Sequence, residues 1–389
     1  MTNLRLVQPK DLVLNEPLPW TLYDAHGNLL LRQGYVLNLP RHIDSLLARG
    51  AYVEEVVVDD EEDAAPAEDM SSPLGQEEVQ ALHDTESVFS RALRLADSLE
   101  RFHADLHSGQ LRPGMHMRIM GMAYVMEQAC AQDADALLAA LHVNRQHPYL
   151  VVHQLLGAAI TAIVVSESKL DDATRTSWVC AALTRDIGLV EIQPQLDQQN
   201  EALSGEQTMM VHHHPVYALD LLEQMGVRDP VWLQVVREHQ ERCDGSGYPQ
   251  GLAGDGMHEG AKLLTVADSY AAMVTPRPNR SPRLPHEAMK DLYAARDGAY
   301  DAQWVAAVIK ALTMFPPGSI VQLASGERAV VRARASSLQT LQTWSVCDEQ
   351  GTLLMPPIPR SAADPAHAIQ RAVPLSTLGS HSHCVVQLW

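Results

Sequence analysis

Residues 244 to 254 read Asp244-Gly245-Ser246-Gly247-Tyr248-Pro249-Gln250-Gly251-Leu252-Ala253-Gly254. Four glycines and a proline exclude the interior of a helix or strand, because glycine readily reaches positive φ and lets backbone approach a ligand closely. The stretch lies between two segments with helical patterning, of which one carries His239 and the other Asp268. Such a loop is either a plain surface turn or the border of a functional site, and the residues around it distinguish these two interpretations.

Composition describes a globular chain of 389 residues, 46% of them hydrophobic, which is long enough for two or three domains. The chain carries 29 basic and 48 acidic side chains, so its net charge is −19. A chain this acidic does not suit binding to DNA or to an anionic membrane, although a local basic spot would still hold a small phosphorylated ligand.

The cysteines and the N-terminal residues indicate in which cellular compartment the protein is expected. The five cysteines are far apart, odd in number and form no Cys-x-x-Cys pair, which favours a reducing environment. The first residues lack the apolar core of a signal peptide, and the longest apolar run, Leu155 to Val165, is shorter than a bilayer requires. We therefore expect a cytoplasmic protein without a membrane span.

Patterning divides the flanking parts of the chain into modules. Residues 1–58 predict a small α/β module with a hairpin at 20–31, a helix at about 40–49 and a strand at 52–58. Residues 59–75 are acidic and rich in small side chains, which is typical of a solvated linker. Residues 316–389 alternate like short strands separated by turns and predict a β-rich module.

The middle of the chain is patterned as helix. Residues 76–146 predict a helical connector, and residues 147–315 a continuous helical domain. The fold class is therefore mainly α, with small α/β or β-rich modules at both ends. The predicted amphipathic helix from Leu82 to Leu106 either packs inside the chain or pairs with a second copy to make a homodimer.

Histidines and aspartates recur along the helical domain, at His153, Asp186, His214, His239 and Asp268. A single histidine in an apolar helix is more often a satisfied core residue than a ligand. An aspartate buried in such a helix, however, must be paired or bind a cation. Imidazole and carboxylate together are ligands of first-row transition metals, so the set predicts a metal site on helices. Because His212, His213 and His214 point in different directions, at most two of them face a common centre.

The order and spacing of these residues resemble the HD-GYP family, bacterial phosphohydrolases of the HD superfamily that hydrolyse cyclic di-GMP. The loop from Asp244 to Leu252 matches the family signature and includes its Gly-Tyr-Pro. Val266-Ala267-Asp268 and Arg277-Pro278-Asn279-Arg280 stand where the family has corresponding segments. The resemblance covers roughly residues 147 to 315 and implies an all-helical HD-superfamily domain.

The resemblance also implies roles for individual residues. Asp186 would be the catalytic carboxylate that bridges metals or orients the attacking water. The implied metal ligands are His153, Asp186, His214, His239 and Asp268. The implied substrate-binding residues are Arg277, Arg280, Gly247 and Tyr248. The implied cofactor is iron or manganese, the substrate is cyclic di-GMP or a related nucleotide, and the partners include a GGDEF-type diguanylate cyclase or another signalling protein.

Three positions depart from the family pattern. Arg185 replaces the histidine of the His-Asp pair, Gln240 replaces the second histidine of a His-His pair, and Leu189 replaces a lysine. Arginine carries a fixed charge, and at position 185 it would pair with Asp186 in place of a metal. We therefore expect a degenerate site with weak or no hydrolysis and a regulatory or adaptor role. The alternative is an active metal-dependent phosphodiesterase. The three departures still leave room for one metal held by His214, His239 and Asp186.

Overall fold

A computed structural model describes residues 4–8, 11–12, 18, 20, 22–23, 29–31, 52–54 and 87–389. The chain divides into two compact units, Met1–Pro73 and Leu74–Trp389. The helix predicted at about 40–49, the end of the strand predicted at 52–58, the acidic stretch 59–75 and residues 76–86 lie outside the described residues.

The described part of the first unit is a four-stranded antiparallel sheet. Its strands are β1 (Leu4–Leu6), β2 (Leu22–Tyr23), β3 (Leu29–Leu31) and β4 (Tyr52–Glu54), in the order β1-β4-β2-β3. Strands β2 and β3 pair with Leu22 opposite Leu31, which confirms the predicted hairpin. Leu22 and Val53 are buried and supply apolar contacts to this sheet.

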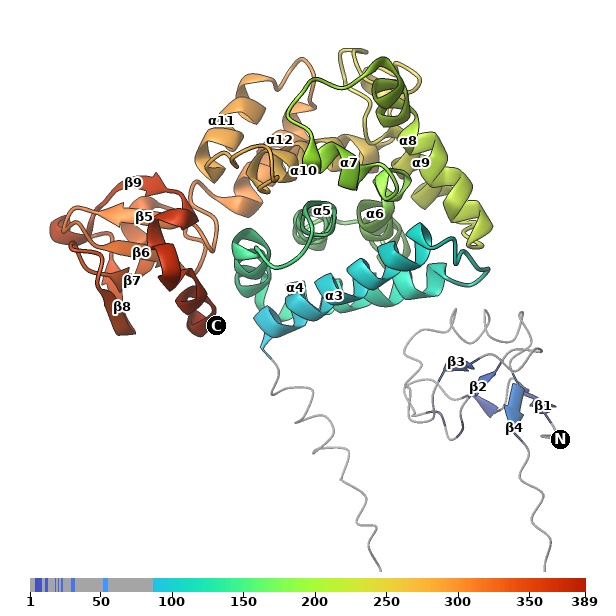
Figure 1. Cartoon of the computed structure of the whole chain (residues 1–389), viewed down its shortest axis with the longest axis horizontal. Helices are drawn as coiled ribbons and strands as arrows, with labels where there is room; N and C mark the ends of the chain where they lie inside the picture. The colour runs from blue at the N-terminus through green and yellow to red at the C-terminus, as the bar shows by residue number, and fades with distance from the viewer. Residues whose placement is uncertain are drawn as a thin grey trace, which may run out of the picture. The chain divides into compact units, whose positions relative to one another are not determined.

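The second unit begins with a helical domain (Figure 1), which confirms the mainly α fold class. Its α-helices are α3 (Val88–His107), α4 (His116–Val143), α5 (Tyr149–Ser166), α6 (Asp172–Thr184), α7 (Gln193–Gln198), α8 (Gly205–Gln224), α9 (Pro230–Glu238), α10 (Glu259–Val274), α11 (Pro285–Ala294) and α12 (Ala302–Leu312). Two short 3₁₀ turns, η2 (Ile187–Leu189) and η3 (Gly254–Gly256), lie between them.

Helix α5 is the centre of this domain, because it contacts α3, α4, α6, α10 and α12 (Figure 1). It is apolar on all sides, as a helix surrounded by other helices must be. Among the described residues, α5 is the one helix long and apolar enough to suit a bilayer, and 94% of it is buried within the protein.

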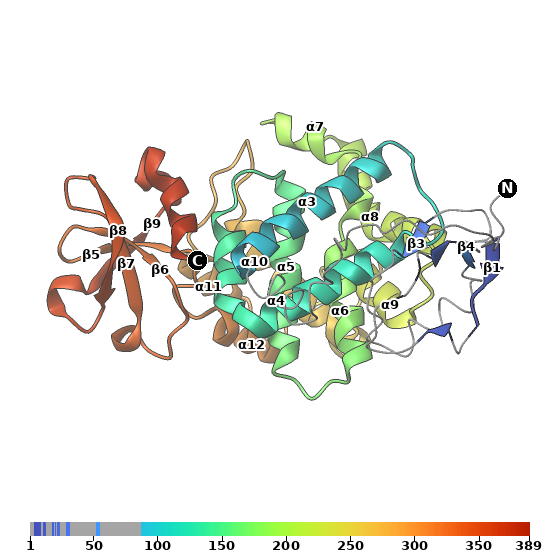
Figure 2. The ribbon, with the colours of Figure 1, turned by 90° about the horizontal axis from the view of Figure 1, so that it is seen from below.

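Helices α3 and α4 run side by side across one face of the domain (Figure 2). The apolar side chains of α3, including Phe89, Leu99 and Phe102, are buried within the chain itself. The apolar face of this helix is thus covered by its own domain. The apolar face of α3 therefore no longer supports the expected homodimer, which remains a prediction.

Two helices of this domain begin at well-formed caps. Ser204 accepts a hydrogen bond from the amide of Gln207, whose side chain in turn accepts from the Ser204 amide, so α8 begins with a complete capping box. Asp229 accepts from the amides of Val231 and Trp232, and Pro230 occupies the first position of α9.

A second antiparallel sheet completes the unit and confirms the β-rich C-terminal module. Its strands are β5 (Ile320–Leu323), β6 (Arg328–Val331), β7 (Gln342–Cys347), β8 (Leu353–Ser361) and β9 (Ile369–Val373), in the order β8-β7-β6-β5-β9. The 3₁₀ segment η6 (Leu375–Leu388) follows. Arg334, beyond β6, ties the module to α4 through a 2.5 Å ion pair with Asp135.

Candidate metal centre

The five predicted ligands meet at one buried place. His153 comes from α5, His214 from α8 and Asp268 from α10. Asp186 lies two residues beyond the end of α6, and His239 is the C-cap of α9. None of the five is more than 6% exposed. Three of the ligands thus lie within helices and two lie just past helix ends, and α7 comes between Asp186 and His214 in the chain.

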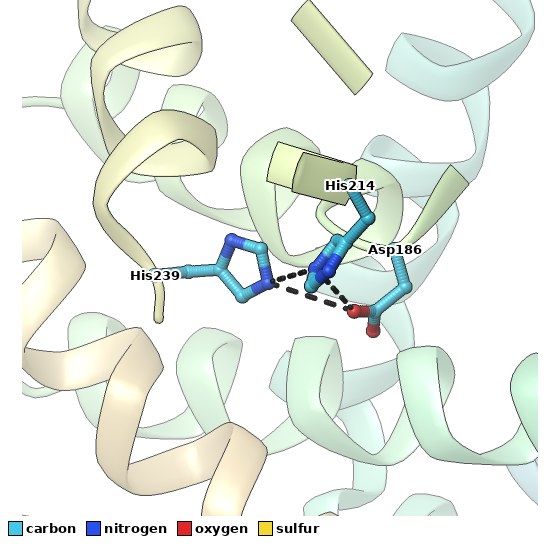
Figure 3. A group of neighbouring side chains, drawn as sticks. All are labelled: Asp186, His214 and His239. Carbon is cyan, nitrogen blue, oxygen red and sulfur yellow. Dashed lines mark hydrogen bonds and ion pairs between the residues drawn. The ribbon is translucent and has the colours of Figure 1, made fainter. Parts of the chain in front are cut away.

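Asp186, His214 and His239 form a group that we call the imidazole cradle (Figure 3). The Nε2 atoms of the two histidines are 3.1 Å apart, and they lie 3.4 and 3.5 Å from Oδ1 of Asp186. Each Nδ1 is held by the carbonyl three residues earlier, Val211 for His214 and Val236 for His239. Because Nδ1 donates its proton to that carbonyl, the neutral ring presents a lone pair at Nε2.

The cradle fits a divalent ion. Two lone pairs and a carboxylate oxygen, all buried and mutually repulsive, need a cation between them. A triangle with these three sides has its equidistant point about 1.9 Å from each corner, close to the roughly 2.0–2.2 Å of metal–nitrogen and metal–oxygen bonds. Backbone carbonyls that fix both rings are the usual support of metal-binding histidines.

His153, Arg185 and Asp268 form a second group beside it, which we call the guanidinium cluster. Arg185 is completely buried, and its Nε donates to Oδ1 of Asp268 over 2.6 Å. The same nitrogen lies 3.2 Å from Oδ2 of Asp186. Arg185 was expected to pair with Asp186; it does so, but its shorter contact is with Asp268. Nε2 of His153 is 2.9 Å from Asp268 and 3.2 Å from Asp186.

Two glycines allow these close approaches. A Cβ atom on Gly157 of α5 would lie 2.9 Å from Nη2 of Arg185, so this glycine makes room for the guanidinium. A Cβ atom on Gly188 would lie 2.4 Å from the carbonyl oxygen of His214. Gly188 thus lets η2 pack on α8, which brings Asp186 to the histidines.

The charges shift the protonation equilibria of the site. Burial alone would raise the pKa of Asp186, but Arg185 and the surrounding histidines outweigh it and hold that pKa well below its usual value. Arg185 and His153 likewise lower the pKa of Asp268 against the effect of burial. Burial lowers the pKa of His239, more than Asp186 raises it. Both carboxylates are therefore ionised at neutral pH, and His239 is a neutral ligand.

A cavity of about 400 Å³ opens over both groups. Its lining includes Tyr149, His153, Asp186, Leu189, Gln193, Asp197, Glu201, His214, Gln240, Arg242, Tyr248, Asp268, Arg277 and Asn279. Of the predicted substrate-binding residues, Tyr248 and Arg277 line this cavity. Gly247 and the exposed Arg280 do not belong to the lining. The ring of Tyr248 stacks on His212 with centroids 4.4 Å apart, while His214 alone of the three consecutive histidines reaches the cradle.

Arg277 is part of a stack of three side chains. Its guanidinium lies 4.2 Å from the ring centroid of Tyr149, and that ring stacks on His153 at 5.2 Å. Arg277 also donates to the hydroxyl of Tyr149. Burial raises the pKa of Tyr149 to about 12, so its hydroxyl stays protonated. The stack places the guanidinium of Arg277 at the cavity wall and connects it through the Tyr149 ring to His153 of the guanidinium cluster.

The glycine-rich loop is fastened to the site by a buried carboxylate. Glu241, fully buried, accepts hydrogen bonds from the amides of Gln250 at 2.7 Å and Leu252 at 2.9 Å. A Cβ atom on Gly247 would lie 2.4 Å from the backbone of Glu241 and Arg242, so this glycine has a packing role. The loop is thereby fixed two residues after His239.

The other departures also border the cavity. Leu189 lines it without charge, and Gln240 reaches Asp268 with its amide nitrogen 3.5 Å from Oδ2. The lining also includes the acidic Asp197 and Glu201, from α7 and the residues after it, and the basic Arg242 and Arg277. The cavity lining thus contains both acidic and basic side chains.

Sequence reasoning missed Tyr149, Gly157 and Glu241. A glycine within the apolar run of α5 was a visible signal for Gly157, since glycine is unfavourable in a helix interior. Glu241 directly follows His239 and Gln240 in the sequence, but no role was predicted for its carboxylate. Nothing in the sequence pairs Tyr149 with Arg277, which is 128 positions away.

Comparison with known proteins agrees with this geometry. Residues 138–304 match the family described as HD domain. A cyclic di-GMP phosphodiesterase of Pseudomonas aeruginosa is 27% identical over 197 residues, 51% of this chain and 47% of that protein. The 3'3'-cGAMP-specific phosphodiesterase 3 of Vibrio cholerae is 26% identical over 213 residues, 54% and 46% of the two chains. The chain thus spans about half the length of these relatives.

One solved structure extends the comparison. A HDG"Y"P protein from Bdellovibrio bacteriovorus covers 79% of this chain and 99% of its own, with 15% identity and a TM-score of 0.49. Residues 138–304 of this chain match the HD domain family, and the Gly-Tyr-Pro loop lies within that match.

Proposed function

We propose that this protein works in bacterial cyclic di-GMP signalling, binds the cyclic dinucleotide over the imidazole cradle, and hydrolyses it weakly or not at all. The observation that carries the proposal is the cradle itself, with its two Nε2 atoms 3.1 Å apart beneath a cavity of about 400 Å³. Relatives described as phosphodiesterases of cyclic di-GMP and of 3'3'-cGAMP support this substrate class.

The chain's own residues supply the contacts that such a ligand needs. Arg277 and Arg242 both line the cavity, where their charge would attract a phosphodiester. Tyr248 offers a ring beside the cradle, against which a base can stack. Asp186 would orient a water toward phosphorus, since its ionised carboxylate lies between both groups.

Iron or manganese is the proposed ion, held by His214, His239 and Asp186. Two imidazoles and a carboxylate are a donor set that suits such ions. A divalent ion there would act as a Lewis acid on a phosphate oxygen and lower the pKa of a water molecule.

Three features support weak hydrolysis. Arg185 forms ion pairs with the carboxylates of both Asp268 and Asp186. Leu189 contributes no charge to the cavity, and the α7 side contributes Asp197 and Glu201, which repel a phosphodiester. Stabilisation of negative charge in the transition state is thereby reduced.

Binding and turnover of cyclic di-GMP by the purified protein, loaded with Mn²⁺ or with Fe²⁺ in the absence of oxygen, test the proposal. We expect metal-dependent binding by calorimetry and little product by chromatography, with 3'3'-cGAMP as a competitor. Arg277→Ala should weaken binding about tenfold or more, while the control Arg296→Ala, at a half-buried position outside the cavity lining, should not. No binding by the metal-loaded protein would refute the proposal.

The alternative is an active metal-dependent phosphodiesterase. It is favoured by one observation: the cradle offers three ligands and opens on the cavity, as catalytic metal sites do. Rapid turnover that is lost in Asp186→Asn would establish it.

An adaptor role adds a protein partner, for which we propose a GGDEF-type diguanylate cyclase. Exposed Met209 and Met210 lie beside Pro249 in a groove next to the loop, and they support such a contact. A cyclase that binds Met209→Glu as tightly as the wild type would refute this surface. We also propose that the protein acts in the cytoplasm, as its cysteine spacing led us to expect.

A further inference from the structure

The site offers two sets of metal-ligating atoms that share one residue. The imidazole cradle is the first set, and His153, Asp186 and Asp268 are the second, with their ligand atoms within 4.8 Å of one another. Asp186 turns Oδ1 to the cradle and Oδ2 to the second set. By donor type alone, the site would hold two ions.

A cation already stands in the second set. Nε of Arg185 is 2.6 Å from Oδ1 of Asp268 and 3.2 Å from Oδ2 of Asp186, so it lies against both carboxylates. Arg185 is fully buried, and its charge cannot be removed by deprotonation at physiological pH. A divalent ion entering there would face a fixed positive charge in a region of low dielectric constant.

The rest of the guanidinium is tied to backbone. Nη1 donates to the carbonyls of Ala182 at 2.5 Å and Gln154 at 3.3 Å, and Nη2 donates to that of His153 at 3.0 Å. Withdrawal of Arg185 would leave these carbonyls without the guanidinium, in a place that water does not reach. The side chain also fits against Gly157, where a Cβ atom would be only 2.9 Å away. Arg185 is thus built into the core and does not exchange with solution.

We propose that Arg185 is a built-in cation that fills the second position of the centre, so that an ion from solution binds only in the imidazole cradle. Arg185 is a positioning residue: it holds Asp268 and Asp186 in place and leaves Oδ1 of Asp186 to the histidines. The inference rests on the proposed function only for the ion in the cradle. The blocking of the second position stands on Arg185 alone.

Metal stoichiometry tests the inference without any measurement of activity. The full chain, freed of metal by chelation, is titrated with Mn²⁺ under equilibrium dialysis, and bound Mn²⁺ is examined by electron paramagnetic resonance. Arg185→His removes the fixed charge and adds a ligand. Arg101→His adds a histidine at an exposed position of α3 and is the matched control. Arg185→Lys keeps the charge with a different shape.

We expect one ion per chain with the spectrum of isolated Mn²⁺ for the wild type, Arg101→His and Arg185→Lys. Arg185→His should bind one ion more, and its spectrum should show coupling between two ions bridged by Asp186. Two ions in the wild type would overturn the inference, whether or not any variant folds. No additional ion in a folded Arg185→His would also overturn it.

The two proposals fail differently. If the wild type binds no ion and Arg185→His binds one, the proposed metal in the cradle is wrong while the role of Arg185 stands. If the wild type binds one ion and Arg185→His gains none, only the role of Arg185 is wrong.

Discussion

Asp186 belongs to the imidazole cradle and also contacts the guanidinium cluster, and the two groups balance its negative charge in opposite ways. In the cradle, two imidazoles turn Nε2 toward Oδ1, and the chain places no permanent cation among these three atoms. In the guanidinium cluster, the chain supplies its own cation at 2.6 Å from Asp268. A permanent charge and an exchangeable one therefore lie side by side in a single buried site.

The difference separates stability from ligand binding. A buried charge pair contributes by compensating charges that would otherwise be stranded, so the guanidinium cluster belongs to the folded core. The cradle has no such internal compensation, and the affinity of the site for a metal ion resides there. Substitutions in the two groups should accordingly change different measurable quantities.

Arg185→Ala should have the largest effect. It leaves Asp186 and Asp268 buried without their counter-ion, and we expect a loss of about 3–5 kcal/mol in the free energy of unfolding of the metal-free protein. Urea denaturation with and without Mn²⁺ measures this loss. Saturating Mn²⁺ should restore part of it, because an ion that binds only the folded state stabilises that state. Equal stability of the variant and the wild type would show that the guanidinium cluster does not stabilise the folded protein.

His239→Gln should have the next largest effect, and on a different quantity. It removes one of three cradle ligands, so the affinity for Mn²⁺ should fall about 100-fold or more, equivalent to about 2.7 kcal/mol. The metal-free protein should keep its stability, since a neutral side chain replaces a neutral ring. Calorimetric titration and urea denaturation together check both statements. A large loss of stability with unchanged affinity would reverse the roles of the two groups.

Glu241→Gln should have the smallest effect and spare both groups. The amide keeps one acceptor for the loop amides of Gln250 and Leu252 but loses the charge that strengthens those bonds, about 1–2 kcal/mol. We expect several-fold weaker nucleotide binding with unchanged Mn²⁺ stoichiometry. A loss of bound Mn²⁺ in this variant would show that the loop and the cradle are not separable.

The helical domain was predictable because its signals are local. The capping box at Ser204, the Asp229-Pro230 start and the glycine-rich loop each act over a few residues. The strands at 320, 328 and 342 were visible from alternation and turns. The residue types of the centre were also visible, because His and Asp are conspicuous in apolar helices.

The division of the centre into two groups was not predictable. Arg185 reaches Asp268 across 83 positions more closely than it reaches its neighbour Asp186, and only the packing of α5, α6 and α10 decides this. Whether Asp186 reaches both groups with its two oxygens depends on η2, whose position follows from the contact of Gly188 with α8. Such choices depend on distant backbone rather than on local sequence.

The most direct test is the crystal structure of the full chain grown with Mn²⁺, with anomalous diffraction used to locate the ion. The account predicts one anomalous peak, among Nε2 of His214, Nε2 of His239 and Oδ1 of Asp186. It predicts a guanidinium, and no peak, between Asp186 and Asp268. A peak between His153 and Asp268, with Arg185 displaced, would contradict it.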